Sequence, residues 1–107
     1  MKLGIFAFFL IILTCSFATG EKETTVVDLK IPKAIFSKTL EWEIYTQGEQ
    51  FIHVIIKHES GKVIYNVERY LYGESYNELD ASEFPKGKYK IEVICGKQSV
   101  SGETIKS

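Results

Sequence analysis

Two alternating segments joined by a short glycine-containing turn constrain the fold of this chain most strongly. Residues 51–57 and 62–70 are rich in β-branched and aromatic side chains, and they flank the sequence His58-Glu59-Ser60-Gly61. A loop of this length that ends in glycine is typical of a β-hairpin, because glycine readily adopts the left-handed conformation that such loops need. A third alternating segment starts at Tyr89. The stretch therefore predicts an antiparallel β domain.

The rest of the chain follows the same two-residue period. Leu40, Trp42 and Ile44 alternate with residues expected to face solvent, and no window shows apolar residues sustained at helical spacing. We expect a turn over 73–76 and a crossover over 81–88, where glycine and proline interrupt the pattern. The expected strands are 24–30, 40–45, 52–57, 62–70, 76–80, 89–95 and 98–105. Seven short segments separated by turn signals favour an all-β fold, a small antiparallel β-sandwich.

The inward positions of these strands give a candidate core. A domain of this size has no other source of stability, because only Cys95 follows the leader described below and no intramolecular disulfide can form. Each large buried side chain contributes roughly 1.5 to 3 kcal/mol, so the burial free energy of the candidate residues is enough to stabilise one core but not two. The candidates are Leu40, Trp42, Ile44, Ile52, Val54, Ile56, Val63, Tyr65, Val67, Leu79, Phe84, Tyr89, Ile91 and Val93.

The N-terminus has the composition of a secretory leader. Lys2 precedes an unbroken apolar run over residues 3–13, which is too short to span a bilayer comfortably. Small residues at Ala18 and Gly20 fit cleavage before Glu21, and a second site lies two residues earlier. We expect a signal peptide over 1–20, with a signal helix that is removed, and one exported domain over 21–107. The protein is then periplasmic or secreted.

Cys15 offers an alternative fate for the leader. The sequence Ile12-Leu13-Thr14-Cys15 resembles a bacterial lipobox, although threonine stands where that motif prefers glycine, alanine or serine. Lipidation of Cys15 would anchor the chain to the outer membrane, since acyl chains contribute about 0.8 kcal/mol per buried methylene. The other interpretation is a tolerated cysteine in a discarded leader, and in that case we expect no membrane association.

Charge argues against a nucleic-acid partner. After removal of the leader, twelve Lys and Arg remain against fourteen Asp and Glu, because Lys2 is lost. Phosphate neutralisation by a basic face supplies most non-specific affinity for nucleic acid, and no such face is expected from this pattern.

Two short motifs and their spacing carry a resemblance. The sequence Gly61-Lys62-Val63-Ile64-Tyr65 precedes Pro85-Lys86-Gly87-Lys88-Tyr89 by about two dozen residues, with Leu79-Asp80 between them and Ser101-Gly102-Glu103-Thr104-Ile105 at the end. Together they resemble a family of small exported proteins of gut-dwelling Gram-negative, Bacteroides-type bacteria whose function is unknown. The resemblance covers the whole mature chain and implies a signal peptide followed by a single immunoglobulin-like sandwich. It implies no catalytic or binding residues.

The same motifs are similar to the C-terminal sorting domains of the type IX secretion system. Those domains share the Gly-Lys hairpin and the Gly-x-Tyr strand start. This sequence has no cargo domain in front of the sandwich, and it ends in Gly102-Glu103-Thr104-Ile105 instead of a basic, apolar tail. We therefore expect the stand-alone family to be the better match.

Few residues suggest chemistry. A thiol nucleophile needs a base within hydrogen-bond reach, and Cys95 has His53 and His58 as its only histidine candidates. Parity places Cys95 with the inward residues of its strand, His53 on the solvent side, and His58 in a loop. Two histidines without a third ligand do not predict zinc, and Glu78, Asp80 and Glu83 suit solvated charge better than calcium. We expect no catalytic site, no metal and no cofactor.

Outward-facing aromatic residues are the strongest sign of a binding surface. Aromatic side chains offer a large contact area with little loss of entropy, so they stack on sugars or anchor protein partners. The alternative is that they cover the edges of the sandwich. Tyr89 has a structural interpretation of its own, a hydroxyl bond to the backbone as in a tyrosine corner. The residues of the candidate surface are Tyr45, Phe51, Ile55, Tyr70, Tyr72 and Tyr76.

These observations favour an exported, non-catalytic binding or interaction module with a protein or glycan partner. One alternative is an inhibitor of an exported protease, which would insert His58–Gly61 or Leu71–Tyr76 into an active-site cleft. Another is a small surface or assembly subunit that pairs through an edge strand. The sequence does not specify the ligand or the oligomeric state.

Overall fold

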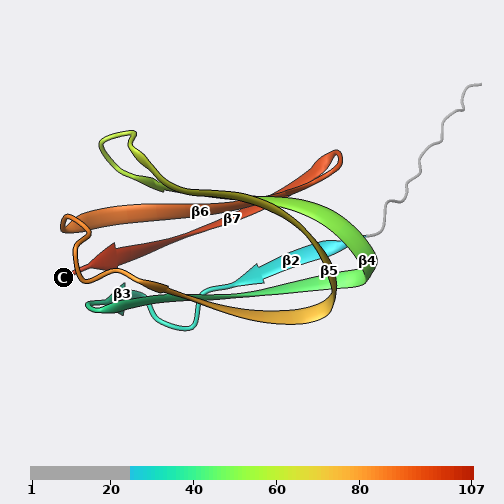
Figure 1. The fold of residues 1–107 in the computed structure, drawn as a ribbon, viewed down its shortest axis with the longest axis horizontal. Coiled ribbons are helices and arrows are strands. Elements are labelled where there is room, and N and C mark those ends of the chain that lie inside the picture. Colours follow the sequence, from blue (N-terminus) through green and yellow to red (C-terminus); the bar gives the residue numbers. More distant parts are fainter. Residues whose placement is uncertain (1–24) are drawn as a thin grey trace, which may run out of the picture.

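The computed structural model describes residues 25–107, and in this range every regular element is a β-strand. The predicted signal helix and Cys15 lie outside the described residues. The strands form one curled, six-stranded sheet (Figure 1), which confirms the prediction of a small all-β domain. They are β2 (Val27–Lys30), β3 (Ile35–Phe36), β4 (Thr39–His58), β5 (Val63–Asp80), β6 (Gly87–Cys95) and β7 (Gln98–Lys106).

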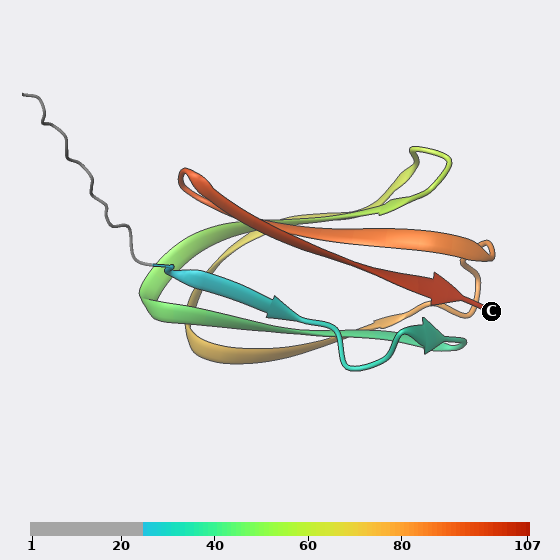
Figure 2. The ribbon, with the colours of Figure 1, turned by 180° about the vertical axis from the view of Figure 1, so that it is seen from behind.

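Two long, bent strands organise the sheet. β5 pairs along one edge of β4 from Thr39↔Asp80 to Lys57↔Val63, while the other edge of β4 pairs first with β2 and then with β6. Both strands turn back at one end of the molecule, so that their halves lie in two facing layers (Figures 1 and 2). β7 continues the sheet from β6, and β3 pairs with β7 in parallel. The result is a sandwich with a barrel-like curl.

The bend lies where the pairing of β4 and β5 slips. Tyr45 pairs with Glu74 but Glu49 pairs with Tyr72, so β4 carries two extra residues opposite Gly73. Gly48 and Gly73 have φ angles of 72° and 80°, a conformation that side chains disfavour. The buried Thr46 hydroxyl accepts a hydrogen bond from the Gly73 amide (3.0 Å) and donates one to the Gly48 carbonyl (2.9 Å). This hydroxyl satisfies backbone groups that the bulge removes from the ladder.

The bend corrects the predicted strand division. The turn expected over 73–76 is absent, because Gly73 is a bulge position inside the continuous strand β5. Likewise the segments 40–45 and 52–57 are the two halves of β4. Four predicted segments therefore merge into two strands.

Most of the predicted core is buried between the layers. Tyr65, Leu79 and Phe84 are partly buried and pack against this core. Val67 on β5 is also partly buried. Val63 was expected inside but is 45% exposed, because a second register shift pairs it with the outward-facing Lys57. The fully buried predicted residues are Leu40, Trp42, Ile44, Ile52, Val54, Ile56, Tyr89, Ile91 and Val93, and the core also includes Val27, Phe36, Ala81 and Cys95.

Two buried polar groups hold the crossover between β5 and β6. The Tyr89 hydroxyl donates to the Pro85 carbonyl, which confirms the predicted corner, and burial raises the pKa of the Tyr89 phenol. Lys106 is 8% exposed, and its ammonium donates to the carbonyls of Ala81, Ser82 (3.2 Å) and Phe84 (3.0 Å). Lys106 of the last strand thus stabilises the crossover by hydrogen bonds. The alternation of apolar residues does not predict that this lysine is buried.

Candidate functional site

The predicted aromatic surface lies on the outward side of β4 and β5. Its residues alternate with core residues such as Ile44 and Ile52, so the whole set points away from the space between the layers. Ile55 is only half-buried on this side. The other five, Tyr45, Phe51, Tyr70, Tyr72 and Tyr76, are 47 to 79% exposed.

The bend divides this set into two groups. Phe51 and Tyr70 are directly opposed beyond the bend, with ring centroids 4.9 Å apart, and Tyr72 is paired with Glu49 next to it. Tyr45 and Tyr76 lie on the other half, in the layer that contains β2. The structure therefore places the six predicted residues on one side of the ribbon but does not gather them into one cluster.

Tyr45 and Tyr76 line a groove of about 470 Å³ over β2, β4 and β5. Its walls also carry Asp28, Glu43 and Glu74, with Lys30 as the one cationic residue among those that line it. A volume of this size is in the range of small-ligand sites. We call this surface the acidic groove: Asp28, Lys30, Glu43, Tyr45, Glu74 and Tyr76, over the backbone of Leu29, Ile44 and Ser75.

Strand pairing arranges the acidic groove in two rows. In one row Glu43 of β4 stands between Lys30 of β2 and Tyr76 of β5. In the next row Tyr45 stands between Asp28 and Glu74. Because same-face neighbours in adjacent rows are two residues apart along each strand, the tyrosines lie on one diagonal and the glutamates Glu43 and Glu74 on the other.

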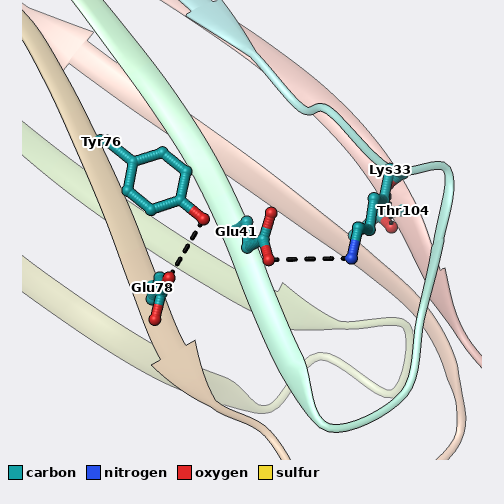
Figure 3. A network of polar contacts seen from close by, with 5 residues as sticks. All are labelled: Lys33, Glu41, Tyr76, Glu78 and Thr104. Atoms are coloured by element: carbon teal, nitrogen blue, oxygen red, sulfur yellow. Dashed lines mark hydrogen bonds and ion pairs between the residues drawn. The ribbon is translucent and has the colours of Figure 1, made fainter.

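A polar network extends the groove toward the start of β4 (Figure 3). The Tyr76 hydroxyl donates a hydrogen bond to Glu78 Oε2 at 3.1 Å. Glu41 lies directly opposite Glu78, and its Oε2 forms an ion pair with Lys33 Nζ at 3.8 Å. Loss of water around the hydroxyl, followed by the hydrogen bonds and negative charges of Glu78 and Glu41, raises the pKa of Tyr76 to about 12. The phenol therefore remains a neutral hydrogen-bond donor at physiological pH.

Sequence reasoning identified the two tyrosines but not the carboxylates around them. Alternation with Leu40, Trp42 and Ile44 puts Glu41 and Glu43 together on the outward face of one strand. The neighbouring positions on β2 and β5 depend on a register that the sequence does not give. The spacing Glu74-x-Tyr76-x-Glu78 was a usable signal, because a strand puts these three side chains on one face.

The candidate thiol and histidines do not assemble. Cys95 is buried, as parity predicted, and its Sγ donates to Gln50 Oε1 at 3.5 Å. His53, half-buried and bonded to Asn66 Oδ1, lies on the other face of the sheet, so the sheet separates it from the thiol. His58 is the last residue of β4, which corrects its expected place in a loop.

Residues 25–107 contain no group of three or more His, Cys, Asp or Glu side chains arranged to hold a metal ion. Near the crossover, Asp80 instead accepts hydrogen bonds from the Ser82 amide (3.0 Å) and hydroxyl (2.8 Å), which lower the pKa of Asp80. Its carboxylate shapes the chain locally.

The surfaces required by the two alternative functions differ in form. His58–Gly61 closes the β4–β5 hairpin, and the Glu59 amide donates to the Lys88 carbonyl at 3.0 Å, so this turn is tied to β6. The prediction that Leu71–Tyr76 forms the other inhibitory loop is wrong, because this segment lies within the strand β5.

β5 pairs only with β4 in the described part of the chain and leaves one edge free. Arg69, on the inward side of this edge opposite Ile52, donates to Asn77 Oδ1 at 3.4 Å. An inward-pointing charge on an edge strand opposes pairing with another strand.

Comparison with known proteins gives no assignment. No protein-family model matches the chain, and no curated protein matches it significantly. Within residues 25–107, no helix is long and apolar enough to cross a membrane.

Proposed function

We propose that this chain is an exported, non-catalytic binding module with an immunoglobulin-like sandwich, and that its ligand surface is the outer face of β2, β4 and β5. The observation that carries the proposal is the acidic groove, in which Tyr45 and Tyr76 remain 54% and 55% exposed. Exposed aromatic side chains grouped with polar ones mark interaction surfaces, because their burial against a partner is favourable.

The form of the groove supports binding over catalysis. Its floor is the backbone of three paired strands, and its tyrosines remain more than half exposed. Enzymes of small reactants usually exclude water from the reacting atoms, whereas a recognition surface functions while open. Export is supported by the apolar run and small residues of the leader, and the sandwich type by the resemblance in its two motifs.

Binding by the mature chain, residues 21–107, to arrays of oligosaccharides and peptides tests this proposal. Replacing both Tyr45 and Tyr76 by alanine will weaken binding of any captured ligand at least about tenfold, because buried aromatic contacts dominate such interfaces. Ile35→Ala is the matched control, since Ile35 is exposed on β3, outside the groove. Equal loss in the control, or none in the tyrosine variant, would place the ligand elsewhere.

Protease inhibition is the second candidate, and one observation favours it. The turn His58–Gly61 is held against residues 86–88, because His58 Nε2 contacts the Lys86 carbonyl at 2.9 Å and Glu59 Oε2 accepts a hydrogen bond from the Lys88 amide at 3.3 Å. A rigid loop loses little entropy on insertion into a cleft. Inhibition predicts protease blockade that Glu59→Ala abolishes and Tyr45→Ala leaves intact.

A further inference from the structure

The acidic groove has an excess of negative charge in its own walls. Asp28, Glu43 and Glu74 face Lys30 alone, which leaves a net charge of about −2 for the ionised groups. Beyond the end of the acidic groove, Glu41 forms an ion pair with Lys33. Glu78 accepts a hydrogen bond from the phenol of Tyr76, which carries no charge. A complementary ligand is therefore cationic.

A pair of like charges just beyond the acidic groove breaks a local rule of sheet pairing. Glu41 and Glu78 are directly opposite on neighbouring strands, a placement in which like charges destabilise a sheet. Sequences that break a local rule of this kind usually do so at functional sites. Lys33 offsets part of the repulsion from one side of the pair.

The diagonal arrangement also specifies the kind of cation. A guanidinium can stack on a tyrosine ring while it pairs with a carboxylate, and the acidic groove places each tyrosine beside a glutamate of the neighbouring strand. An ammonium is a compact, strongly hydrated point charge and gains less from the ring. The two rows repeat the combination, so the groove can accommodate two cationic side chains that are two residues apart on an extended segment.

Other ligand classes fit the acidic groove less well. A metal ion needs convergent ligands, and the carboxylates in the described chain do not form such a group. Nucleic acid and other polyanions are repelled by the net charge. A neutral sugar can stack on the tyrosines but leaves Asp28, Glu43 and Glu74 with Lys30 as the one cationic residue among those that line the groove.

We infer that the acidic groove binds an extended, arginine-containing basic segment of a partner polypeptide. Each of two arginine side chains lies against one tyrosine, Tyr45 or Tyr76, and pairs with the glutamate next to it, Glu74 or Glu43. The inference rests on the proposed function, to which it adds the chemistry of the ligand.

Titration calorimetry of residues 21–107 with a short oligo-arginine peptide tests the inference, with an oligo-lysine peptide of the same length beside it. We expect the arginine peptide to bind several-fold more tightly, and the affinity to fall with added salt, because exposed charges are screened. Glu43→Gln combined with Glu74→Gln will weaken binding at least about fivefold. Glu83→Gln combined with Glu103→Gln makes the same charge change at exposed positions outside the groove and will leave the affinity within about twofold.

Three results would overturn the inference. They are no binding of oligo-arginine at low salt, equal affinity for the arginine and lysine peptides, and equal loss in both glutamine double variants. A neutral oligosaccharide that binds the wild type and the Glu43→Gln, Glu74→Gln variant equally, but not the Tyr45, Tyr76 double alanine variant, overturns the basic ligand and retains the binding module. If neither peptides nor sugars depend on the two tyrosines, the proposed function fails as well.

Discussion

Replacing Lys106 by methionine will destabilise the domain although no catalytic or binding group is touched. Lys106 is 8% exposed, and its ammonium donates to the carbonyls of Ala81, Ser82 and Phe84. Methionine retains an unbranched apolar side chain but leaves these carbonyls without their donor. A buried polar group that loses its hydrogen-bond partner costs about 1 to 3 kcal/mol, so we expect the free energy of unfolding to fall by about 2 to 3 kcal/mol.

This loss is measurable in a simple assay. Trp42 is the single tryptophan and is buried, so its fluorescence reports unfolding in urea. For a domain of this size, about 2 to 3 kcal/mol corresponds to a decrease in Tm of roughly 10 to 20 °C. Lys90→Met, at an exposed position of β6, is the control and should change stability by less than about 0.5 kcal/mol. A Lys106→Met protein as stable as this control would refute the role assigned to the ammonium.

Three further predictions concern Trp42, Tyr89 and Tyr76. Trp42→Phe will cost only about 1 to 2 kcal/mol against about 3 to 5 for Trp42→Ala, because the buried indole Nε1 has no hydrogen-bond partner to lose; denaturation followed by circular dichroism measures both, and equal costs would contradict this. Tyr89→Phe will cost about 1 to 2 kcal/mol through loss of the bond to Pro85, and an unchanged denaturation midpoint would show that the corner is not needed. The pKa of Tyr76 is raised from 10.0 to about 12, so the unfolded chain releases this proton first and stability falls as pH rises from 10 toward 12. The tyrosinate absorbance of the wild type minus that of Tyr76→Phe should have its midpoint near 12, and a midpoint near 10 would show that Glu78 and Glu41 do not act on the phenol.

Local patterns were sufficient to predict the strand content and much of the core. Alternation identifies Leu40, Trp42 and Ile44 because one face of a strand meets the core and the other meets water. The Tyr89 corner was also predictable, since a tyrosine just after a crossover has a backbone carbonyl within reach of its hydroxyl.

Features that depend on long-range register could not be predicted in the same way. A glycine such as Gly73 signals a turn and a bulge equally, and the choice depends on the buried hydroxyl of Thr46, which lies 27 residues away in the sequence. Lys106 resembles any surface lysine until the crossover carbonyls converge on it.

The candidate site also contains some residues that a local pattern predicts and others that depend on long-range strand pairing. Tyr45 and Tyr76 were predictable as outward aromatics, because each alternates with inward residues of its own strand. Their grouping with Asp28 depends on the pairing of β2 with β4, which no local pattern of the short β2 segment specifies. The charge of the acidic groove is therefore a property of the folded sheet.

A chemical-shift map of residues 21–107 with bound oligo-arginine tests the central claim most directly. We expect the perturbed amides to lie in 28–30, 41–45 and 74–78, the three strand segments that form the acidic groove and its polar extension. The amides of His58–Gly61 and of β7 should keep their shifts. Perturbation centred on that turn, or spread evenly over the surface, would contradict the assignment of the ligand surface to β2, β4 and β5.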